Sequence, residues 1–276
     1  MFGMLGSNLK CTSNLVDSIV DWMRQAGEMA MQYFRDIEPQ YKADRTFITQ
    51  ADIEIERFLC QRIRSACPTH LLIGEEESPR KAPQDFSDIW AIDPIDGTTA
   101  FVQGLPGWGI SIGLLHQGQP YFGAFYMPLL NDMTYTSEQE LIYCNNRYLC
   151  HSVRPDWGAK GFLAVNASAH YDFRINVQRT RALGGIGASL VYTARGAAVG
   201  AFIPKAYLWD LVAGAAIVTQ AGGELRYLSG RPLDYEELLD GRLAPEPIIA
   251  AHANLQTELR DLISPHEQLN HLSRHN

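Results

Sequence analysis

Residues 90–104, WAIDPIDGTTAFVQG, combine an apolar strand pattern with two aspartates and an abrupt Gly-Thr-Thr. The apolar run predicts a strand that ends at Asp93, and residues 97–99 predict the start of a helix. Asp93 and Asp96 are three residues apart in a segment with no other charge. Two carboxylates this close repel each other unless a positive group lies between them. The stretch therefore predicts a strand–turn–helix unit that needs a positive partner.

The composition and net charge favour some classes of protein and partner and argue against others. Of the 276 residues, 46% are hydrophobic and 20% are charged, which is ordinary for a globular protein. A net charge of -8 argues against nucleic acid as a partner, although a small anionic substrate stays possible if metal ions supply positive charge. The five cysteines are odd in number and form no CxxC pair, which predicts a reducing, cytoplasmic location. We find no pattern of a signal peptide or membrane span, so no membrane partner is expected.

Hydrophobic spacing predicts a mixed order of helices and strands. Helices are expected over 15–34 and 50–66, the second with Thr49 as N-cap and Asp52 as the capping-box acid. Strands follow over 109–116, 120–127 and 133–136, and an apolar helix within 209–223. The polar segment 141–156 is the expected joint between an N-terminal half, 1–150, and a C-terminal half, 151–276. This alternation predicts an α/β fold with helices packed over more than one sheet.

Carboxylates stand beside predicted ordered structure at four separate places. One opens a helix, a run of three follows a short strand, two flank Pro-Ile, and one precedes an apolar helix. Mg²⁺ prefers carboxylate and backbone carbonyl oxygens, and two ions held by shared carboxylates would remove the repulsion between neighbouring acids. A helix start beside them would offer N–H groups to a phosphate. The candidate groups are Asp52, Glu75, Asp93, Asp96, Asp210 and the carbonyl of Ile95.

Each of these acids also has an ordinary structural interpretation. Asp52 and Asp210 suit helix caps, residues 75–77 suit a solvated loop, and Asp-Pro-Ile-Asp-Gly suits a turn. Local rules do not require all four in one chain. Their combination keeps a metal-dependent phosphoryl-transfer site open beside the structural interpretation.

Three motifs, read together, resemble a known family. They are GEEES at 74–78, DPIDGTTAFVQGLP at 93–106 and WDLVAGAAIVTQAGG at 209–223. In order and approximate spacing they are similar to the inositol monophosphatase superfamily of Mg²⁺-dependent, lithium-sensitive phosphatases, over most of the chain. The resemblance implies a layered αβαβα sandwich of two sheets, as in fructose bisphosphatase, with the metal site between the halves. It also implies a homodimer.

The resemblance further implies roles for individual residues and two or three Mg²⁺ per site. The first ion would be held by Glu75, Asp93 and the Ile95 carbonyl, the second by Asp93, Asp96 and Asp210, and a third by Glu75. Asp52, Thr98 and Glu75 would orient and deprotonate the attacking water. The expected phosphate and substrate contacts are Gly97, Thr98, Gly185 and Ile203, with Lys42 as a further basic residue near the site.

The chain departs from the family pattern around the phosphate and the leaving group. Ala100 replaces a common Asn, Gly185 replaces a Ser, and Ile203 replaces a Glu that holds the inositol ring. None of these changes removes an expected metal ligand, so phosphatase chemistry is expected while inositol as the substrate is doubtful. Two interpretations stay open for the arginines near the start of the C-terminal half: contact with the substrate, or a position on a solvated surface. These arginines are Arg174, Arg179 and Arg181.

These observations predict an enzyme, a phosphoric monoester hydrolase that acts on an inositol, histidinol or sugar phosphate. One alternative is a phosphatase of 3′-phosphoadenosine nucleotides or of fructose 1,6-bisphosphate. An alternative of another class is an interaction protein that keeps the fold within a transcription complex and has little catalytic activity. The complete set of acids favours the enzyme.

Overall fold

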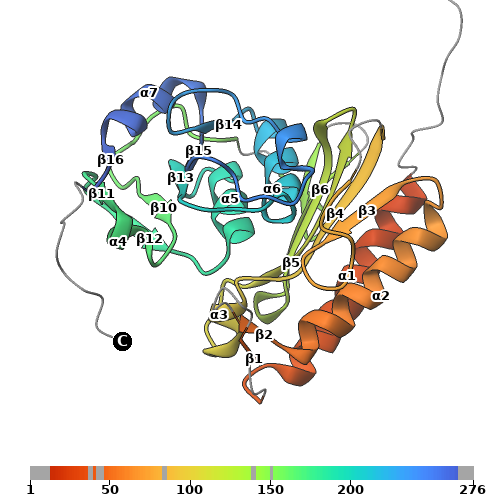
Figure 1. Ribbon diagram of the computed structural model, residues 1–276. Coiled ribbons are helices and arrows are strands. Elements are labelled where there is room, and N and C mark those ends of the chain that lie inside the picture. The colour runs from red at the N-terminus through yellow and green to blue at the C-terminus, as the bar shows by residue number, and fades with distance from the viewer. Residues whose placement is uncertain are drawn as a thin grey trace, which may run out of the picture.

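The computed structural model describes residues 13–36, 40–41, 47–82, 86–137, 141–149 and 152–266, and its larger sheet forms the centre of the N-terminal half (Figure 1). That sheet has seven strands in chain order. Its first pair is parallel and every other pair is antiparallel. The strands are β3 (Leu71–Gly74), β4 (Asp88–Asp96), β5 (Gly109–His116), β6 (Gln119–Met127), β7 (Asp132–Thr136), β8 (Ile142–Cys144) and β9 (Arg147–Tyr148).

The second sheet belongs to the C-terminal half and has five strands of mixed direction. In spatial order they are β12 (Thr180–Ala182), β10 (Leu163–Val165), β13 (Gly200–Ile203), β15 (Ile248–Ala251) and β14 (Glu224–Tyr227). Two short antiparallel pairs accompany the sheets: β1 (Gln40–Tyr41) with β2 (Phe47–Ile48), and β11 (Phe173–Ile175) with β16 (Ile263–Pro265).

Helices complete five layers. α1 (Ser13–Tyr33) and α2 (Gln50–Ala66) cover the outer face of the larger sheet, and α5 (Ile186–Ala194) and α6 (Leu208–Gln220) lie between the sheets (Figure 1). α7 (Ala253–Asp261) and the short α4 (Ala169–Asp172) pack on the outer side of the second sheet. The connecting pieces are α3 (Thr98–Val102) and the 3-10 turns η1 (Pro128–Leu130) and η2 (Glu236–Leu238). This order confirms the predicted αβαβα sandwich.

Several elements begin and end where the sequence predicts them. α2 covers 50–66 and β5 covers 109–116 as expected, and Thr49 and Asp52 form the reciprocal capping box. The expected joint over 141–156 is more regular than its polarity indicates, because β8 and β9 form a hairpin that extends the larger sheet. The division into 1–150 and 151–276 stays a prediction, and the strands of each sheet lie within one of these halves.

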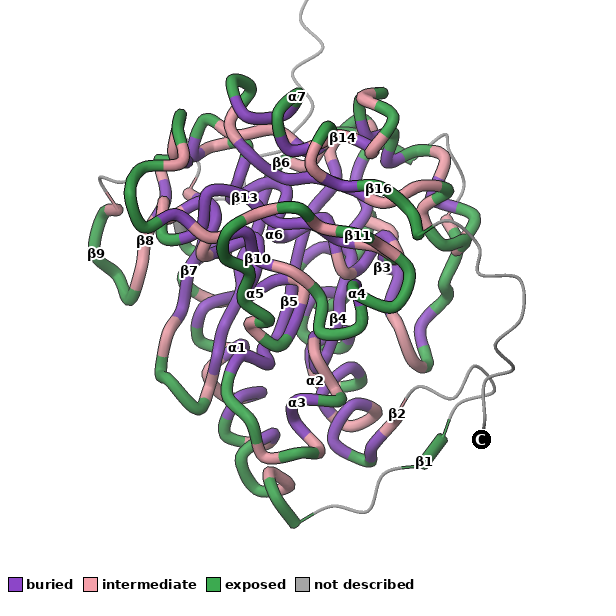
Figure 2. The backbone as a smooth tube through the Cα atoms, turned by 90° about the vertical axis from the view of Figure 1, so that its left-hand side faces the viewer, coloured by how far each residue is buried: buried purple, intermediate pink, exposed green. Residues whose placement is uncertain are grey.

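α6 is the centre of the core, and it is apolar around its whole circumference because both of its sides are covered. It packs against β4, β5 and β6, where two cross-strand glycines make room for it. A Cβ on Gly123 would lie 2.1 Å from the Ala213 carbonyl oxygen, and one on Gly113 would lie 2.5 Å from the Ala213 nitrogen. Figure 2 shows buried backbone concentrated in this region.

Among the helices of the described residues, none is long and apolar enough to cross a bilayer.

A buried ion pair also joins the two halves. Arg195, at the end of α5, donates to both carboxylate oxygens of Asp132 on β7, with one bond of 2.7 Å, and also to the Thr134 hydroxyl. Both charged side chains are more than four-fifths buried. Removing one member would leave the other charge with little solvent and without its oppositely charged partner.

We therefore expect Arg195→Met to lower the free energy of unfolding by about 3 kcal/mol, because Asp132 loses its bidentate partner. Urea unfolding followed by circular dichroism measures this loss. The matched control is Arg242→Met, since Arg242 pairs with Asp240 at the exposed surface, where such a pair contributes little. Equal effects of the two variants would contradict a structural role for the buried pair.

Candidate active site

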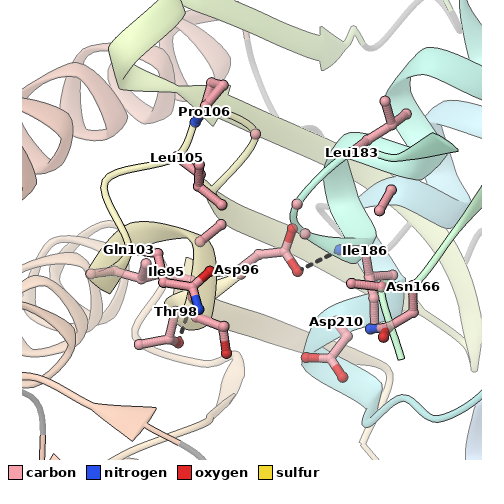
Figure 3. A pocket seen from close by; sticks show the side chains of 18 of the residues that line it. Ile95, Asp96, Thr98, Gln103, Leu105, Pro106, Asn166, Leu183, Ile186 and Asp210 are labelled. Atoms are coloured by element: carbon pink, nitrogen blue, oxygen red, sulfur yellow. Dashed lines mark hydrogen bonds between the residues drawn. The ribbon is translucent and has the colours of Figure 1, made fainter. Parts of the chain in front are cut away.

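One pocket of about 840 Å³ opens where the end of β4 meets α3 and the starts of α5 and α6. Four acids from separate parts of the chain line it: Glu75, Asp93, Asp96 and Asp210. Figure 3 shows Thr98 on one side, Asp210, Asn166 and Ile186 on the other, and the Asp96 carboxylate between them. The structure thus brings together acids that lie up to 135 positions apart (210 − 75).

The turn after β4 is built around the backbone of Ile95. The pairing of β4 with β5 changes register between Asp93 and Asp96, which bends the strand end. Asp93 Oδ1 accepts a 3.0 Å hydrogen bond from the Ile95 N–H, and the Thr98 hydroxyl donates to the Ile95 carbonyl at 3.1 Å. Gly97 then adopts φ +87°, a left-handed conformation that favours glycine, and α3 begins at Thr98. The predicted order of strand, turn and helix is present, but β4 runs to Asp96 instead of ending at Asp93, because its pairing with β5 resumes after the register shift, at Asp96 and Gly109.

Asp96 connects this turn to the C-terminal half. Its carboxylate accepts hydrogen bonds from the first N–H groups of α5, those of Ile186 at 2.9 Å and Gly187 at 2.8 Å (Figure 3). A Cβ on Gly185 would lie only 1.9 Å from Asp96 Oδ2. Gly185 therefore makes room for this carboxylate, which serves as the anionic partner at the start of α5.

Burial and mutual repulsion raise the pKa values of the buried acids. Burial raises the pKa of Asp96 to about 7, while the backbone N–H groups of Ile186 and Gly187 act in the opposite direction. The pKa of Asp93 is raised well above its usual range, first by burial and then by the charges of Glu75, Asp96, Asp210 and Asp52. No Lys, Arg or His is found among the described residues that line the pocket. The site is thus rich in negative charge and lacks its own positive partner there.

The two capping acids combine a local role with a place at or near the site. Asp52 is fully buried, and its Oδ2 accepts hydrogen bonds from the Thr49 N–H at 2.7 Å and hydroxyl at 2.5 Å. Asp52 does not line the pocket, but its charge is one of the causes of the raised pKa of Asp93. Asp210 Oδ2 accepts from the Tyr207 N–H at 2.7 Å and does line the pocket.

A scan against family models matches residues 12–264 to the inositol monophosphatase family. The chain belongs to this family. Its predicted class, a phosphoric monoester hydrolase, is confirmed with it.

Individual relatives of this family differ in their described roles. The chain is 30% identical to a protein described as a putative Nus factor SuhB of Neisseria meningitidis, over 88% of this chain and 95% of the relative. It is 28% identical to the 3′(2′),5′-bisphosphate nucleotidase CysQ of Shigella flexneri, over 80% and 94%. An inositol monophosphatase/NADP phosphatase solved with Mg²⁺ and phosphate has the same fold, with a TM-score of 0.79 at 19% identity, covering 92% of this chain and 96% of that one.

Several residues predicted for the site lie elsewhere in this inositol monophosphatase fold. Ile203 is buried in β13 within the core and does not line the pocket, so it does not face a leaving group there. Arg174, Arg179 and Arg181 are exposed and do not line the pocket; Arg181 stacks 4.7 Å from the Phe162 ring. Lys42 lies outside the described residues.

The structure adds contacts that the sequence reasoning missed. The guanidinium of Arg80, just after the acidic turn, stacks over Tyr207 at 4.9 Å and Trp209 at 4.6 Å, next to Asp210. This stack joins the Glu75 segment to the start of α6. The other missed residue is Glu56, whose carboxylate is buried against the acidic turn. The signal for Glu56 is its position four residues after Asp52, on the same face of α2.

The raised pKa values predict how stability depends on pH without divalent cations. Between the pKa of an unfolded aspartate, about 4, and the raised folded values, the folded state binds more protons than the unfolded state. Its free energy of unfolding must therefore fall as pH rises from 5 towards 8. Urea unfolding in chelator at pH 5.5 and 8 measures the fall. Asp93→Asn, which removes one buried acid, should show a flatter profile; a steeper fall in that variant would contradict the assignment.

Proposed function

We propose that this chain is a Mg²⁺-dependent phosphatase that hydrolyses a small phosphate monoester with a water molecule as nucleophile. The observation that carries the proposal is the acid-rich pocket, where the described lining residues include four carboxylates and no basic side chain. A dianionic phosphate cannot enter such a pocket unless cations first neutralise it.

The donor set fits a hard divalent cation. Carboxylate oxygens of Glu75, Asp93, Asp96 and Asp210, with the Ile95 carbonyl, are the ligand type that Mg²⁺ prefers. Among the described residues, no three His, Cys, Asp or Glu side chains already lie together at metal-ligand spacing. We therefore expect these carboxylates to shift, lose any bound protons and coordinate the ions when two or three Mg²⁺ bind.

When bound, Mg²⁺ would neutralise the phosphate, lower the pKa of the attacking water and stabilise the leaving oxygen. The chain's own residues would do the remaining work. Glu75 and Thr98 line the pocket and would orient the water. Asp52, which lies outside the pocket lining, would assist them through its charge. The N–H groups of Gly97 and Thr98 would hold phosphate oxygens at the turn.

The lining residues other than the acids determine which kind of leaving group the pocket can bind. Leu105, Leu183 and Ile186 form apolar parts of the wall, as Figure 3 shows. Polar side chains beyond the acids are those of Thr98, Thr99, Gln103, Asn166, Ser168 and Tyr192. Because the apolar wall can pack against carbon atoms of the leaving group, we propose a leaving group with an apolar face and fewer hydroxyls than inositol, such as histidinol or a sugar.

A nucleotide is the second candidate, and the size of the pocket favours it. About 840 Å³ can contain a nucleoside as well as a phosphate, and the CysQ relative is described as a 3′(2′),5′-bisphosphate nucleotidase. We further propose that the protein acts in the cytoplasm as a homodimer, with no membrane or nucleic-acid partner.

The test is phosphate release from a panel of esters with and without Mg²⁺. The panel contains inositol 1-phosphate, histidinol phosphate, fructose 1,6-bisphosphate, adenosine 3′,5′-bisphosphate and NADP. We expect Mg²⁺-dependent release from at least one ester, and a loss of about 100-fold or more in Asp93→Asn because a ligand charge is removed. The control is Asp88→Asn, at the other end of β4 and paired with His116.

Full turnover in Asp93→Asn would contradict the metal role of this acid. Release by the wild type in chelator would contradict Mg²⁺ dependence. No release from any ester, by a folded protein that co-purifies with transcription proteins, would favour an interaction role like that in the name of the SuhB relative.

A further inference from the structure

A second buried carboxylate lies on α2, one turn after Asp52. Glu56 has no exposed surface, although it is a charged residue on a helix that covers the outside of the sheet. Burying a carboxylate is costly unless hydrogen bonds or charges replace the lost water. The partners of Glu56 therefore show what its burial achieves.

The partners of Glu56 are backbone N–H groups of the acidic turn. Its Oε2 accepts from the Glu76 N–H at 2.6 Å, and its Oε1 accepts from the N–H groups of Glu77 at 2.9 Å and Ser78 at 2.6 Å. Successive N–H groups that converge on one anion form a rigid, concave turn. The backbone that carries Glu75 into the pocket is thus wrapped around the Glu56 carboxylate.

The turn is fitted to this carboxylate on its other sides as well. A Cβ on Gly74 would lie 2.8 Å from Glu56 Oε1, so a larger residue at 74 would force the two apart. The Gly74 N–H donates to the Pro79 carbonyl at 3.3 Å and closes the turn. The Ser78 hydroxyl contacts Cys60 Sγ at 3.1 Å, one turn further along α2. Contact with α2 therefore explains both the glycine and the serine of GEEES.

The acids of GEEES then have different roles. Glu77 forms an exposed ion pair with Arg57 on α2. Glu75 is the one whose side chain lines the pocket, beside Asp93. Glu75 directly precedes the N–H groups that Glu56 holds.

We propose that Glu56 is a positioning residue of the phosphatase site. Its carboxylate holds the N–H groups of residues 76–78 and so aims the Glu75 carboxylate at the Asp93 side of the pocket. This inference rests on the proposed role of Glu75 as a Mg²⁺ ligand. Without Glu56 the turn would relax, and Glu75 would bind the ion less often while keeping its own charge.

The test compares Glu56→Gln with Glu54→Gln, the same chemical change two residues away on the same helix. Glu54 accepts hydrogen bonds from the Tyr33 hydroxyl at 2.8 Å and the Gln50 amide at 3.0 Å. In Glu56→Gln we expect faster hydrogen exchange at the amides of 76–78 and an approximately 10-fold weaker Mg²⁺ affinity by calorimetry. The Mg²⁺ concentration for half-maximal phosphate release should rise by the same factor. Glu54→Gln should match the wild type in all three measurements.

Gly74→Ala tests the same contact from the other side and keeps the Glu56 charge, so it serves if Glu56→Gln does not fold. Its Cβ should displace the turn and weaken Mg²⁺ binding in the same way. Faster exchange with unchanged Mg²⁺ affinity in either variant would show a merely structural contact and overturn the proposal. If the wild type itself binds no Mg²⁺, the proposed function fails, and this role of Glu56 fails with it. A wild type that binds Mg²⁺, with Glu56→Gln unchanged, overturns only the role of Glu56.

Discussion

Repulsion between two carboxylates at the end of β4 is the constraint on which the site depends. Asp93 and Asp96 are both nearly fully buried, so water cannot screen their charges. The fold relieves part of this repulsion with backbone N–H groups: that of Ile95 for Asp93, and those opening α5 for Asp96. Burial, and after it the charges of neighbouring acids such as Glu75, raises the pKa of both acids. A divalent cation that binds here must therefore compete with protons for these carboxylates.

The acids are held by elements from both halves, so the halves must keep their relative positions. Asp96 in the N-terminal half binds the start of α5, and Arg80 stacks on Tyr207 and Trp209 at the start of α6. Arg195 and Asp132 add a buried ion pair between α5 and β7. α6 itself packs into the groove that Gly113 and Gly123 leave on the larger sheet. These contacts explain how a pocket assembled from distant segments can have a fixed shape.

The sequence predicts those features that local chemistry determines. The capping box of α2 and the bounds of β5 follow from residue types and spacing alone. The gathering of acids from three motifs is what the resemblance to the inositol monophosphatase superfamily implies. Contacts between distant segments are not written in local patterns. The fit of Gly185 to Asp96 joins residues 89 positions apart (185 − 96), and Ile203 looks equally suited to a pocket or to a buried strand. Glu56 has only one sequence signal, its spacing of four residues from Asp52, because its partners are backbone groups that have no sequence signature.

Calorimetry of Mg²⁺ binding in two buffers of different ionisation enthalpy tests the central claim most directly. If the buried acids hold protons that an ion must displace, Mg²⁺ binding near pH 6.5 releases protons to the buffer, and the measured heat differs between the two buffers. The release should shrink as pH rises above 8, where Asp96, with a pKa of about 7, has already lost its proton. Mg²⁺ binding with the same heat in both buffers at pH 6.5, or no binding at all, would contradict the account.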